Sequence, residues 1–395
     1  MRSRVACIAA LGLLLACESG GSATEGTSSS SGTSGSSSDI STTEGGSTTT
    51  DPTTTGTSST GDETTTGAGE SSSSGGPPAP TYDVHYMGRF ELSEGMPRST
   101  WSGSTARTRI DGSGVSIGLD GPAGIHFQVA VDGVPTSVFV TDAGPQSYVV
   151  ASDLAPGVHD VEVVRRNEGY FGIVTYAGFE LGADTSFLQT PWPYGQHIEF
   201  IGDSLTAGYG IECASGEKDF SAPTQSAYAS YAMVAGRILE ASVHLIAFSG
   251  KGVLQNYGGN TDEPMSELWT RTFTGQAEPQ WDWASRPADV VVVNLGTNDF
   301  SAPIDAADFT AAYVALLTDV RTRYPDAAIV SVTWASWGAE REGWVTEALA
   351  QFGDANVSTQ RFEVLPEEGW GCDFHTNVVT NQRFGEQLAE HIAGL

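Results

Sequence analysis

Apolar and polar residues alternate with two different periods along this chain, and the period changes near residue 190. Before that point, short runs rich in β-branched and aromatic residues are separated by turn residues such as Asp132-Gly133 and Pro156-Gly157. This pattern predicts about eight strands without an intervening helix, which is typical of an all-β sandwich of the jelly-roll type. The expected strands cover residues 84–92, 107–110, 114–119, 125–131, 137–140, 147–151, 158–165 and 173–181.

After residue 193, apolar strands alternate with amphipathic helices. The strands are expected at 197–201, 243–248, 290–295, 328–333 and 360–364, and the helices at 226–240, 305–323, 343–352 and 377–393. This order predicts an α/β fold in which helices cover both faces of a parallel sheet and ligands bind at the carboxyl ends of the strands. We therefore expect a β-sandwich domain over residues 81–190 and an α/β domain over residues 191–395.

The first 80 residues differ from the rest in composition. Residues 1–16 join a basic start to an apolar run too short to span a bilayer, which predicts a signal peptide. The run ends at Leu14-Leu15-Ala16-Cys17, which is similar to a bacterial lipobox, so we expect Cys17 to be lipidated, with an ordinary secretory signal as the alternative. Residues 17–80 are dominated by Ser, Thr, Gly and acidic residues, which predicts a disordered tether. An exported lipoprotein at the outer membrane or cell surface is the expected result.

Charge narrows the range of partners. The 395 residues include 48 acidic and 18 basic side chains, giving a net charge of −30, so binding to nucleic acid or to an anionic membrane is disfavoured. A neutral polysaccharide is a more suitable partner. We expect the protein to be a monomer that contacts a membrane only through its lipid anchor.

Two cysteines remain for the folded part, because the other two lie in the signal peptide and the lipobox. Cys213 and Cys372 should form a disulfide, since an even pair is usually oxidised in an exported protein, and separate buried thiols are the alternative. Neither cysteine has the spacing that is typical of a zinc site.

Three residues predict nucleophilic catalysis. Gly202-Asp203-Ser204 follows an expected strand, and this places the serine where an α/β sheet exposes a nucleophile. His375 precedes the last helix and is the best candidate for the base, because the other histidines lie in the β domain, in strands or in a helix. Asp373 is two residues away, and in an extended loop its carboxylate would lie on the same side and accept from the imidazole Nδ1.

Acyl transfer also requires donors for the carbonyl oxygen, which becomes negatively charged during attack. Three donors are available: the backbone N–H of Ser204, the backbone N–H of Gly250 and the side-chain amide of Asn298. Ordinary turn chemistry is the alternative for Gly250 and Asn298. Trp334 and Trp337 follow an expected strand and are candidates for a platform on which a sugar stacks, with simple packing as the alternative.

These motifs resemble the SGNH, or GDSL-type, hydrolase superfamily. The positions that match its four named residues are Ser204, Gly250, Asn298 and His375. The resemblance implies a flavodoxin-like three-layer catalytic domain. A preceding β domain, the stretch 164–169 and the Asp-x-His motif narrow the resemblance to carbohydrate esterase family 2 over about residues 83–395. Phe374 stands where that family usually has a tryptophan, and it is therefore a further candidate for the sugar site.

The resemblance implies a serine esterase that removes O-acetyl groups from polysaccharides such as xylan or glucomannan by a Ser-His-Asp mechanism. It implies no metal and no organic cofactor. Two alternatives stay open. The first keeps the chemistry but changes the substrate to a bacterial cell-wall polysaccharide, an exopolysaccharide or a lipid ester. The second is a non-catalytic carbohydrate-binding surface protein in which the β domain carries the function.

Overall fold

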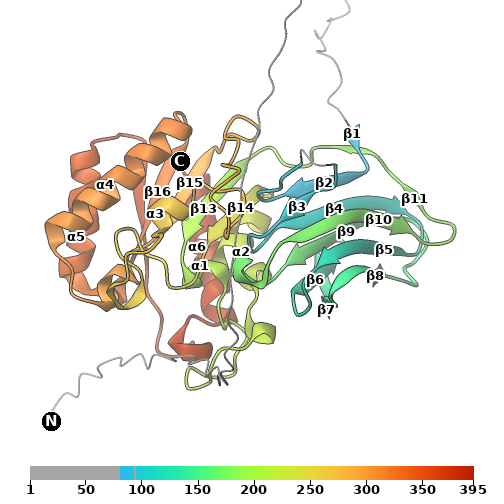
Figure 1. Cartoon of the computed structure of the whole chain (residues 1–395), viewed down its shortest axis with the longest axis horizontal. Coiled ribbons are helices and arrows are strands. Elements are labelled where there is room, and N and C mark those ends of the chain that lie inside the picture. The colour runs from blue at the N-terminus through green and yellow to red at the C-terminus, as the bar shows by residue number, and fades with distance from the viewer. Residues whose placement is uncertain (1–80, 93–94) are drawn as a thin grey trace, which may run out of the picture. The chain divides into compact units, whose positions relative to one another are not determined.

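The computed structural model describes residues 81–92 and 95–395. The predicted signal peptide, the lipobox Cys17 and the tether up to residue 80 lie outside these residues. The described residues belong to one compact unit. Within that unit, β-strands extend to Pro191 and an α/β arrangement begins at His197 (Figure 1). Among the described residues, no helix has both the length and the apolar character needed to cross a bilayer.

The β part is a jelly-roll sandwich. Its strands are β1 (Thr81–Tyr82), β2 (Val84–Met87), β3 (Arg98–Ser99), β4 (Thr105–Asp111), β5 (Val115–Gly121), β6 (His126–Val131), β7 (Val134–Val140), β8 (Gly144–Ala151), β9 (Val158–Arg165), β10 (Val174–Leu181), β11 (Ser186–Phe187) and β12 (Thr190–Pro191). One antiparallel sheet has the order β3-β10-β5-β8, and the other has the order β11-β4-β9-β6-β7 with β2 beside β4. From β3 to β10 this is the double Greek-key order of a jelly roll, so the predicted fold of this part is confirmed.

The core of the sandwich lies between the two sheets. Ile110, Ile117, Phe127, Val163 and Tyr176 come from five different strands and are almost completely buried. Alternate positions of β4 point outward, as expected for a strand with one face in the core. The burial of these side chains stabilises the sandwich at about 1.5–3 kcal/mol for each large apolar residue.

The α/β part contains a five-stranded parallel sheet. Its strands are β13 (His197–Gly202), β14 (Ser242–Ala247), β15 (Val290–Asn294), β16 (Ala328–Trp334) and β17 (Val357–Phe362). They lie in the order β14-β13-β15-β16-β17, with every neighbouring pair parallel. This is the flavodoxin-like order 2-1-3-4-5, as predicted. The central strands are buried along their whole length because helices cover both faces.

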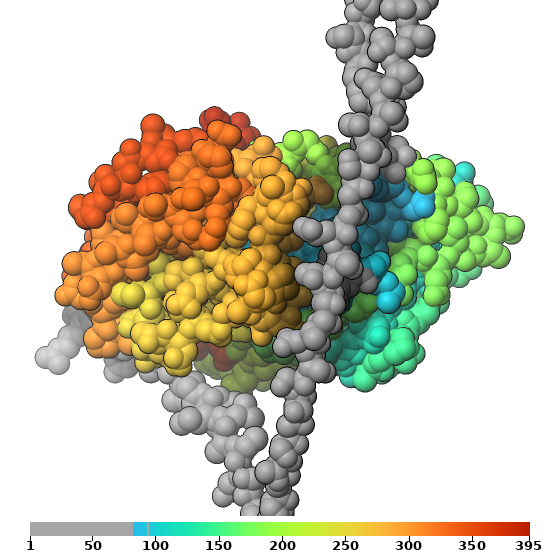
Figure 2. All heavy atoms as spheres, turned by 45° about the horizontal axis from the view of Figure 1, so that its top comes forward, coloured from blue at the N-terminus to red at the C-terminus, as the bar shows by residue number. Residues whose placement is uncertain are grey.

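Six α-helices and seven short 3₁₀ turns accompany the strands in the described part of the chain. They are α1 (Ser204–Ala207), α2 (Tyr231–Ile238), α3 (Met265–Leu268), α4 (Ala306–Arg323), α5 (Gly338–Phe352), α6 (Val378–Ala393), η1 (Gly169–Phe171), η2 (Ala222–Thr224), η3 (Ala227–Ala229), η4 (Tyr257–Gly259), η5 (Asp299–Ser301), η6 (Ala335–Trp337) and η7 (Cys372–Phe374). Helices α4 and α5 pack together, and α2 packs against α6 (Figure 1). In Figure 2 the yellow surface of the segment between β14 and β15 borders the orange surface of α4 and α5.

The helix predicted over 226–240 is shorter in the structure. Ser230 has an extended backbone (φ −65°, ψ 153°), so η3 ends there and α2 begins one residue later. The helix predicted over 305–323 is present as α4, and Asp305 caps it by accepting from the N–H of Ala307. The last helix is capped in the same way by Asn377.

Candidate active site

Ser204 lies at the carboxyl end of β13, as the first residue of α1. Asp203 is the N-cap of this short helix, and its carboxylate accepts from the N–H of Leu205 at 3.0 Å. The Ser204 hydroxyl lies 2.9 Å from Nε2 of His375, a residue 171 positions further along the chain. The structure therefore brings the predicted nucleophile and the predicted base to hydrogen-bonding distance.

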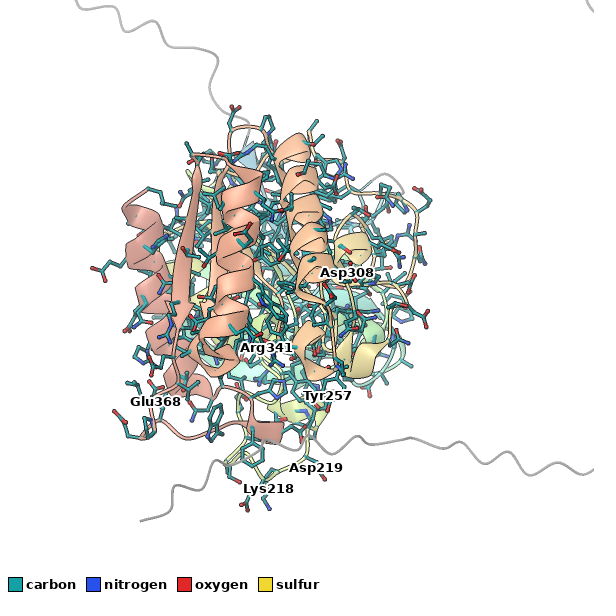
Figure 3. All side chains as sticks on the ribbon, turned by 90° about the vertical axis from the view of Figure 1, so that its left-hand side faces the viewer. Lys218, Asp219, Tyr257, Asp308, Arg341 and Glu368 are labelled. Carbon is teal, nitrogen blue, oxygen red and sulfur yellow. A yellow bond between two sulfur atoms is a disulfide. The ribbon has the colours of Figure 1, made fainter. Side chains whose placement is uncertain are left out.

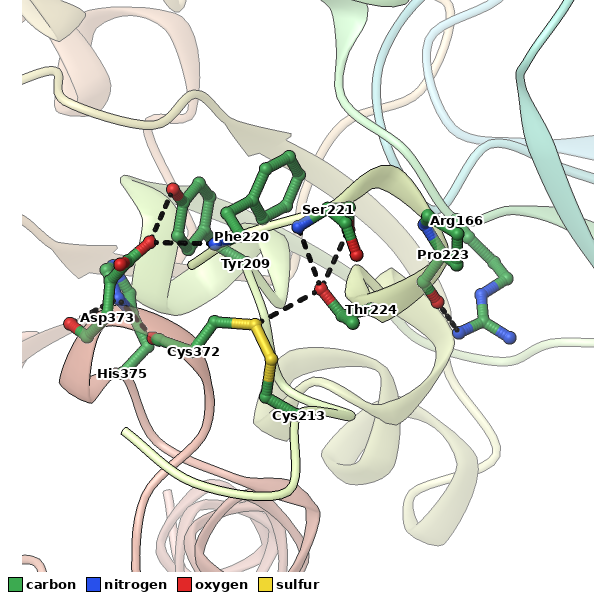
Figure 4. Close-up of a disulfide and its surroundings, with 10 residues drawn as sticks. All are labelled: Arg166, Tyr209, Cys213, Phe220, Ser221, Pro223, Thr224, Cys372, Asp373 and His375. Atoms are coloured by element: carbon green, nitrogen blue, oxygen red, sulfur yellow. Dashed lines mark hydrogen bonds between the residues drawn. A yellow bond between two sulfur atoms is a disulfide. The ribbon is translucent and has the colours of Figure 1, made fainter. Parts of the chain in front are cut away.

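The loop that carries His375 is attached to the loop that follows Ser204. Gly210 O accepts from the N–H of Cys372 at 2.9 Å, and Lys218 O accepts from the N–H of Asp373 at 3.0 Å. A disulfide joins Cys213 to Cys372, the two cysteines paired in the sequence prediction (Figure 4). The loops that carry Lys218 and Glu368 lie at the same end of the molecule in Figure 3. These links fix the imidazole relative to the serine.

Main-chain carbonyls orient His375. Its Nδ1 lies 3.2 Å from the carbonyl oxygen of Cys372 and 3.2 Å from that of Asp373. The prediction that the Asp373 carboxylate accepts from Nδ1 is wrong. It assumed an extended loop, but Asp373 and Phe374 have φ values of 50° and 55°, so this segment coils through the left-handed region. Alternate side chains therefore do not lie on one side.

The Asp373 carboxylate instead holds Tyr209 and Phe220, and Tyr209 lies beside the histidine. The carboxylate accepts from the hydroxyl of Tyr209 at 2.9 Å and from the N–H of Phe220 at 3.2 Å (Figure 4). The rings of Tyr209 and His375 are 4.5 Å apart and tilted. Tyr209 was missed by sequence reasoning, although it belongs to the Gly-Tyr-Gly stretch after the nucleophile. Burial raises the pKa of Tyr209, so its hydroxyl stays a donor.

Burial also controls the protonation of His375. It lowers the pKa of the imidazole below the usual 6.5, and the two carbonyls at Nδ1 oppose this shift only in part. A neutral imidazole with its proton on Nδ1 donates to the carbonyls and leaves Nε2 free to accept from Ser204. This tautomer is the one that a general base needs.

Two backbone N–H groups are available beside the serine. Among the described residues, no hydrogen bond engages the N–H of Ser204 or that of Gly250. Gly250 has a φ of +78°, which glycine adopts readily and other residues rarely do. Asp299 holds the rest of this loop through hydrogen bonds from the N–H groups of Val253, Leu254 and Gln255. The loop is thus fixed with a backbone N–H left unpaired at Gly250.

The third predicted donor is engaged elsewhere in the structure. The side-chain nitrogen of Asn298 donates to Asp203 at 3.0 Å and to the carbonyl oxygen of Lys251 at 2.9 Å, which accounts for both of its hydrogens. Asn298 therefore braces the nucleophile turn and the Gly250 loop. Its role as an oxyanion donor stays a prediction and requires one of these bonds to be shared. Burial raises the pKa of Asp203 to about 7, and the charges of Asp299 and Glu168 add to the shift.

Glu168 reaches this site from the β-sandwich. Its carboxylate accepts from the N–H and from the hydroxyl of Ser249, and from the side-chain amide of Gln225. The residue is fully buried, and burial raises its pKa. Sequence reasoning did not identify this contact, because 81 positions separate the two partners.

The tryptophans predicted to bind sugar are buried. Trp334 is only 4% exposed; it donates to Asn294 and packs on Phe362, so its assignment as a platform is wrong. Trp337 is 8% exposed and packs against Phe300, so simple packing explains it as well. Trp334 is the last residue of β16, and Trp337 lies in η6 directly after it. Phe374, by contrast, is 54% exposed beside the active-site loop and stays a candidate for substrate binding.

Comparison with known families separates the chain into the same two parts. The model of the family described as "Carbohydrate esterase 2 N-terminal" matches residues 86–191. The model of the "GDSL-like Lipase/Acylhydrolase family" matches residues 200–366.

Individual relatives resemble both parts at once. Cellulase/esterase CelE of Acetivibrio thermocellus is 34% identical over 78% of this chain, and the chain spans 39% of that protein's length. An acetylxylan esterase / glucomannan deacetylase of Cellvibrio japonicus is 30% identical, over 68% of this chain and 76% of the relative. A solved family two carbohydrate esterase from Clostridium thermocellum, in complex with cellohexaose, is 34% identical and superposes with a TM-score of 0.75, covering 79% of this chain and 98% of that one.

Proposed function

Because the chain belongs to carbohydrate esterase family 2, we propose that it is a serine esterase that removes O-acetyl groups from polysaccharides. One observation carries the proposal: the hydroxyl of Ser204 lies 2.9 Å from Nε2 of His375, beside unpaired N–H groups of Ser204 and Gly250. The Ser204–His375 pair supplies the nucleophile and the base that acyl transfer requires, and the two unpaired N–H groups support the proposal of an oxyanion site. This arrangement argues against the alternative of a non-catalytic binding protein.

In the first step, Ser204 Oγ attacks the carbonyl carbon of the acetyl group while His375 Nε2 takes the hydroxyl proton. The imidazolium is stabilised because its Nδ1–H already donates to the carbonyls of Cys372 and Asp373. The carbonyl oxygen becomes an oxyanion and accepts from the N–H groups of Ser204 and Gly250. Each such donor contributes about 3–4 kcal/mol when it is fixed in advance.

In the second step, the bond between the acetyl carbon and the sugar oxygen breaks, and His375 Nε2 returns its proton to that oxygen. The sugar leaves with a free hydroxyl group, and the acetyl group stays on Ser204. A water molecule then attacks this ester while His375 takes one of its protons. The bond between the acetyl carbon and Ser204 Oγ then breaks, and His375 Nε2 returns its proton to Ser204 Oγ. Acetic acid leaves and loses its proton to water as acetate, so the enzyme ends in its starting state.

We propose acetylated plant polysaccharides, such as xylan or glucomannan, as the substrate class. Two observations support this choice: the name of the Cellvibrio japonicus relative and the net charge of −30, which favours a neutral polymer. The exposed Phe374 would offer an apolar face to a sugar ring next to the nucleophile.

The test is an acetate-release assay with the purified protein. Substrates would be 4-nitrophenyl acetate, acetylated xylan, acetylated glucomannan and O-acetylated peptidoglycan. We expect acetate from the small ester and from xylan or glucomannan, and none from Ser204→Ala. Release from peptidoglycan alone would instead support the cell-wall alternative, and release from no substrate would overturn the esterase proposal.

We also propose that the protein is exported and anchored by a lipid on Cys17. The sequence Leu14-Leu15-Ala16-Cys17 supports this, and so does the Cys213–Cys372 disulfide, because such bonds persist in oxidising compartments. Labelling cells with an alkyne analogue of palmitate should tag the wild-type chain in the membrane fraction but not the Cys17→Ser variant. Equal labelling of both chains would contradict the anchor.

A further inference from the structure

We propose that Glu168 of the β-sandwich is a positioning residue for the esterase reaction, because it holds the peptide that presents the N–H of Gly250 to the oxyanion. The inference rests on the proposed function and deepens it. Glu168 does not reach the reacting atoms itself. It acts through Ser249, which immediately precedes Gly250.

The geometry at Ser249 is bidentate. One carboxylate oxygen of Glu168 accepts from the Ser249 N–H, and the other accepts from the Ser249 hydroxyl at 2.7 Å. Holding both groups fixes the backbone of Ser249 and its side-chain rotamer together. The next peptide plane carries the N–H of Gly250, so its direction depends on how Ser249 is held.

Contacts within the loop hold Gly250 in part: Lys251 N–H donates to Phe248 O at 3.3 Å and Tyr257 N–H donates to Gly250 O at 2.8 Å, but neither bond involves Ser249. The Gly250 N–H therefore still depends on how Ser249 is held. The φ of Gly250, +78°, lies in the left-handed region, and no atom would lie within 4 Å of a Cβ built there. A glycine in open space can adopt many backbone conformations, so packing at Gly250 does not select this one. After Gly250 the loop is held by Asn298, which donates to Lys251 O, and by Asp299. Before Gly250, at Ser249, it is held by Glu168.

Glu168 is itself rigidly placed. Its backbone carbonyl accepts from Arg165 at 3.0 Å, and its carboxylate accepts from Gln225 at 2.7 Å. The ring of Tyr170, two residues later, contacts Phe248 at a centroid distance of 6.0 Å. Burying a carboxylate is costly unless hydrogen bonds compensate it, and three donors converge on this one. The connection between β9 and β10 therefore clamps the loop after β14.

This arrangement gives the β-sandwich a part in catalysis. The donor at Gly250 belongs to the α/β part, but the group that aims it comes from the other part. We therefore expect the sandwich to be needed for turnover of small esters that are too short to reach any separate binding surface. A module that served only to bind polysaccharide would not be required for such substrates.

The first experiment compares the full chain with Glu168→Gln and Glu168→Ala on 4-nitrophenyl acetate. We expect kcat to fall about 10-fold for the glutamine variant and about 100-fold for the alanine variant, with KM within about threefold of the wild type. The matched control is Glu162→Gln, which changes a partly buried glutamate of the same sandwich that contacts Arg107 and Tyr194. A rise in KM with kcat unchanged, or an equal loss in the control, would overturn the proposal.

A second comparison isolates the path through Ser249. Ser249→Ala removes the hydroxyl that donates to Glu168 but keeps the N–H, so we expect a smaller loss of kcat than for Glu168→Ala. The losses of Glu168→Gln and Ser249→Ala should not multiply in the double variant, because they act on one contact. Fully multiplicative losses would show that Glu168 acts elsewhere.

A readout that does not use activity separates this proposal from the proposed function. Hydrogen–deuterium exchange of the peptide covering residues 248–252 should become faster in Glu168→Gln, while the peptide covering β15 stays protected. Unchanged exchange in the loop would refute the positioning role even in an active enzyme. A wild-type protein without esterase activity would refute the proposed function, and the exchange result would still decide whether Glu168 holds the loop.

Discussion

The two ends of the parallel sheet use the same residue types for opposite purposes. At the carboxyl end, His375 meets Ser204 and has a partner at each ring nitrogen. At the amino end, His197 and His244 lie on the neighbouring strands β13 and β14 with their ring centroids 4.0 Å apart. Both sites contain histidines and nearby carboxylates. In the described part of the chain, the carboxyl end holds a serine hydroxyl 2.9 Å from a histidine nitrogen, with N–H groups that have no hydrogen-bond partner, and no such serine–histidine hydrogen bond is present at the amino end.

The amino-end cluster consists of His197, Glu199 and His244, which are all buried, and the charge of Glu199 is paired. Within the described residues, three ring nitrogens have no hydrogen-bond partner: Nδ1 and Nε2 of His197, and Nδ1 of His244. Glu199 lies beside them, and one carboxylate oxygen and one nitrogen from each ring lie within 4.8 Å of one another, close enough to bind one metal ion. However, Arg89 pairs with Glu199 at 2.9 Å and Tyr324 donates to it at 3.0 Å, so its charge is already balanced. Residue type alone therefore does not distinguish a reactive site from a structural one.

The difference lies in what surrounds each imidazole. The carboxyl end opens to loops whose backbone supplies carbonyls for Nδ1 of His375 and N–H groups for an oxyanion. The amino end is packed by Trp281 and by the buried Arg89, which provides a positive charge and no acceptor. We therefore expect substitutions at the carboxyl end to change the rate and substitutions at the amino end to change stability.

The largest expected effect is the loss of the nucleophile. Ser204→Ala should lower kcat/KM for 4-nitrophenyl acetate by at least about 10⁴-fold, because oxyanion donors and binding alone provide little acyl transfer. Its urea midpoint should match that of the wild type, since the residue makes no core contact that alanine loses. If the variant keeps activity within tenfold of the wild type, Ser204 is not the nucleophile and the carboxyl end is not the reactive site.

The matching change at the amino end is Glu199→Gln. It leaves the Arg89 guanidinium buried without a counter-charge, which should lower the free energy of unfolding by about 3–5 kcal/mol. Urea denaturation followed by tryptophan fluorescence measures this effect, and kcat of the folded fraction should be retained. The control is Glu342→Gln at the exposed pair with Arg361, which should leave the midpoint nearly unchanged. A large loss of kcat in Glu199→Gln would show that the two ends are coupled.

Acid should destabilise the fold through the amino end. Burial holds the pKa of His197 and of His244 well below 6.5, so below pH 6.5 the unfolded chain binds protons that the folded chain does not. Stability from this source is complete above pH 6.5 and falls as the pH drops toward the folded-state pKa values. At one pH unit below 6.5, each histidine should lower the free energy of unfolding by about 1.4 kcal/mol. His244→Phe should flatten the dependence of the urea midpoint on pH, and an unchanged slope would contradict the assignment.

At the carboxyl end, a lowered histidine pKa affects the reaction rate rather than stability. The pKa of His375 is lowered by burial, and the base must be neutral to accept the serine proton. The acid limb of kcat/KM should therefore have its midpoint below pH 6.5. A profile on 4-nitrophenyl acetate between pH 4.5 and 8, measured within the range where the protein stays folded, tests this. A midpoint above 6.5 would require a carboxylate partner at Nδ1.

The sequence predicted this fold well because its apolar residues recur with a clear strand or helix spacing. The apolar runs predicted β4, β5, β6, β9 and β10 and all five parallel strands to within a few residues. The sequence also placed Ser204 at the carboxyl edge of the sheet, because it follows a predicted parallel strand. His375 was predicted as the base from its place in the loop before the last helix and because the other histidines lie in less suitable positions. Contacts that depend on loop conformation or on distant segments were harder to predict. The Glu168–Ser249 contact joins two parts of the chain, and the burial of Trp334 depends on helix α6 packing over its strand.

Asp373 shows that the spacing of residues in a sequence does not determine a contact when the loop conformation is unknown. Its substitution should have the smallest effect of those predicted for this protein. Asp-x-His matches the spacing of a triad, but the left-handed backbone turns the carboxylate toward Tyr209. Asp373→Asn keeps an acceptor for that hydroxyl and leaves the carbonyls at Nδ1 in place, so kcat should fall by less than about threefold. In proteases where a carboxylate holds the histidine, the same change costs about 10⁴-fold. A loss of that size would show that the carboxylate turns to His375 during turnover. Tyr209→Phe separates the two roles, because it removes the partner of Asp373 without touching the charge.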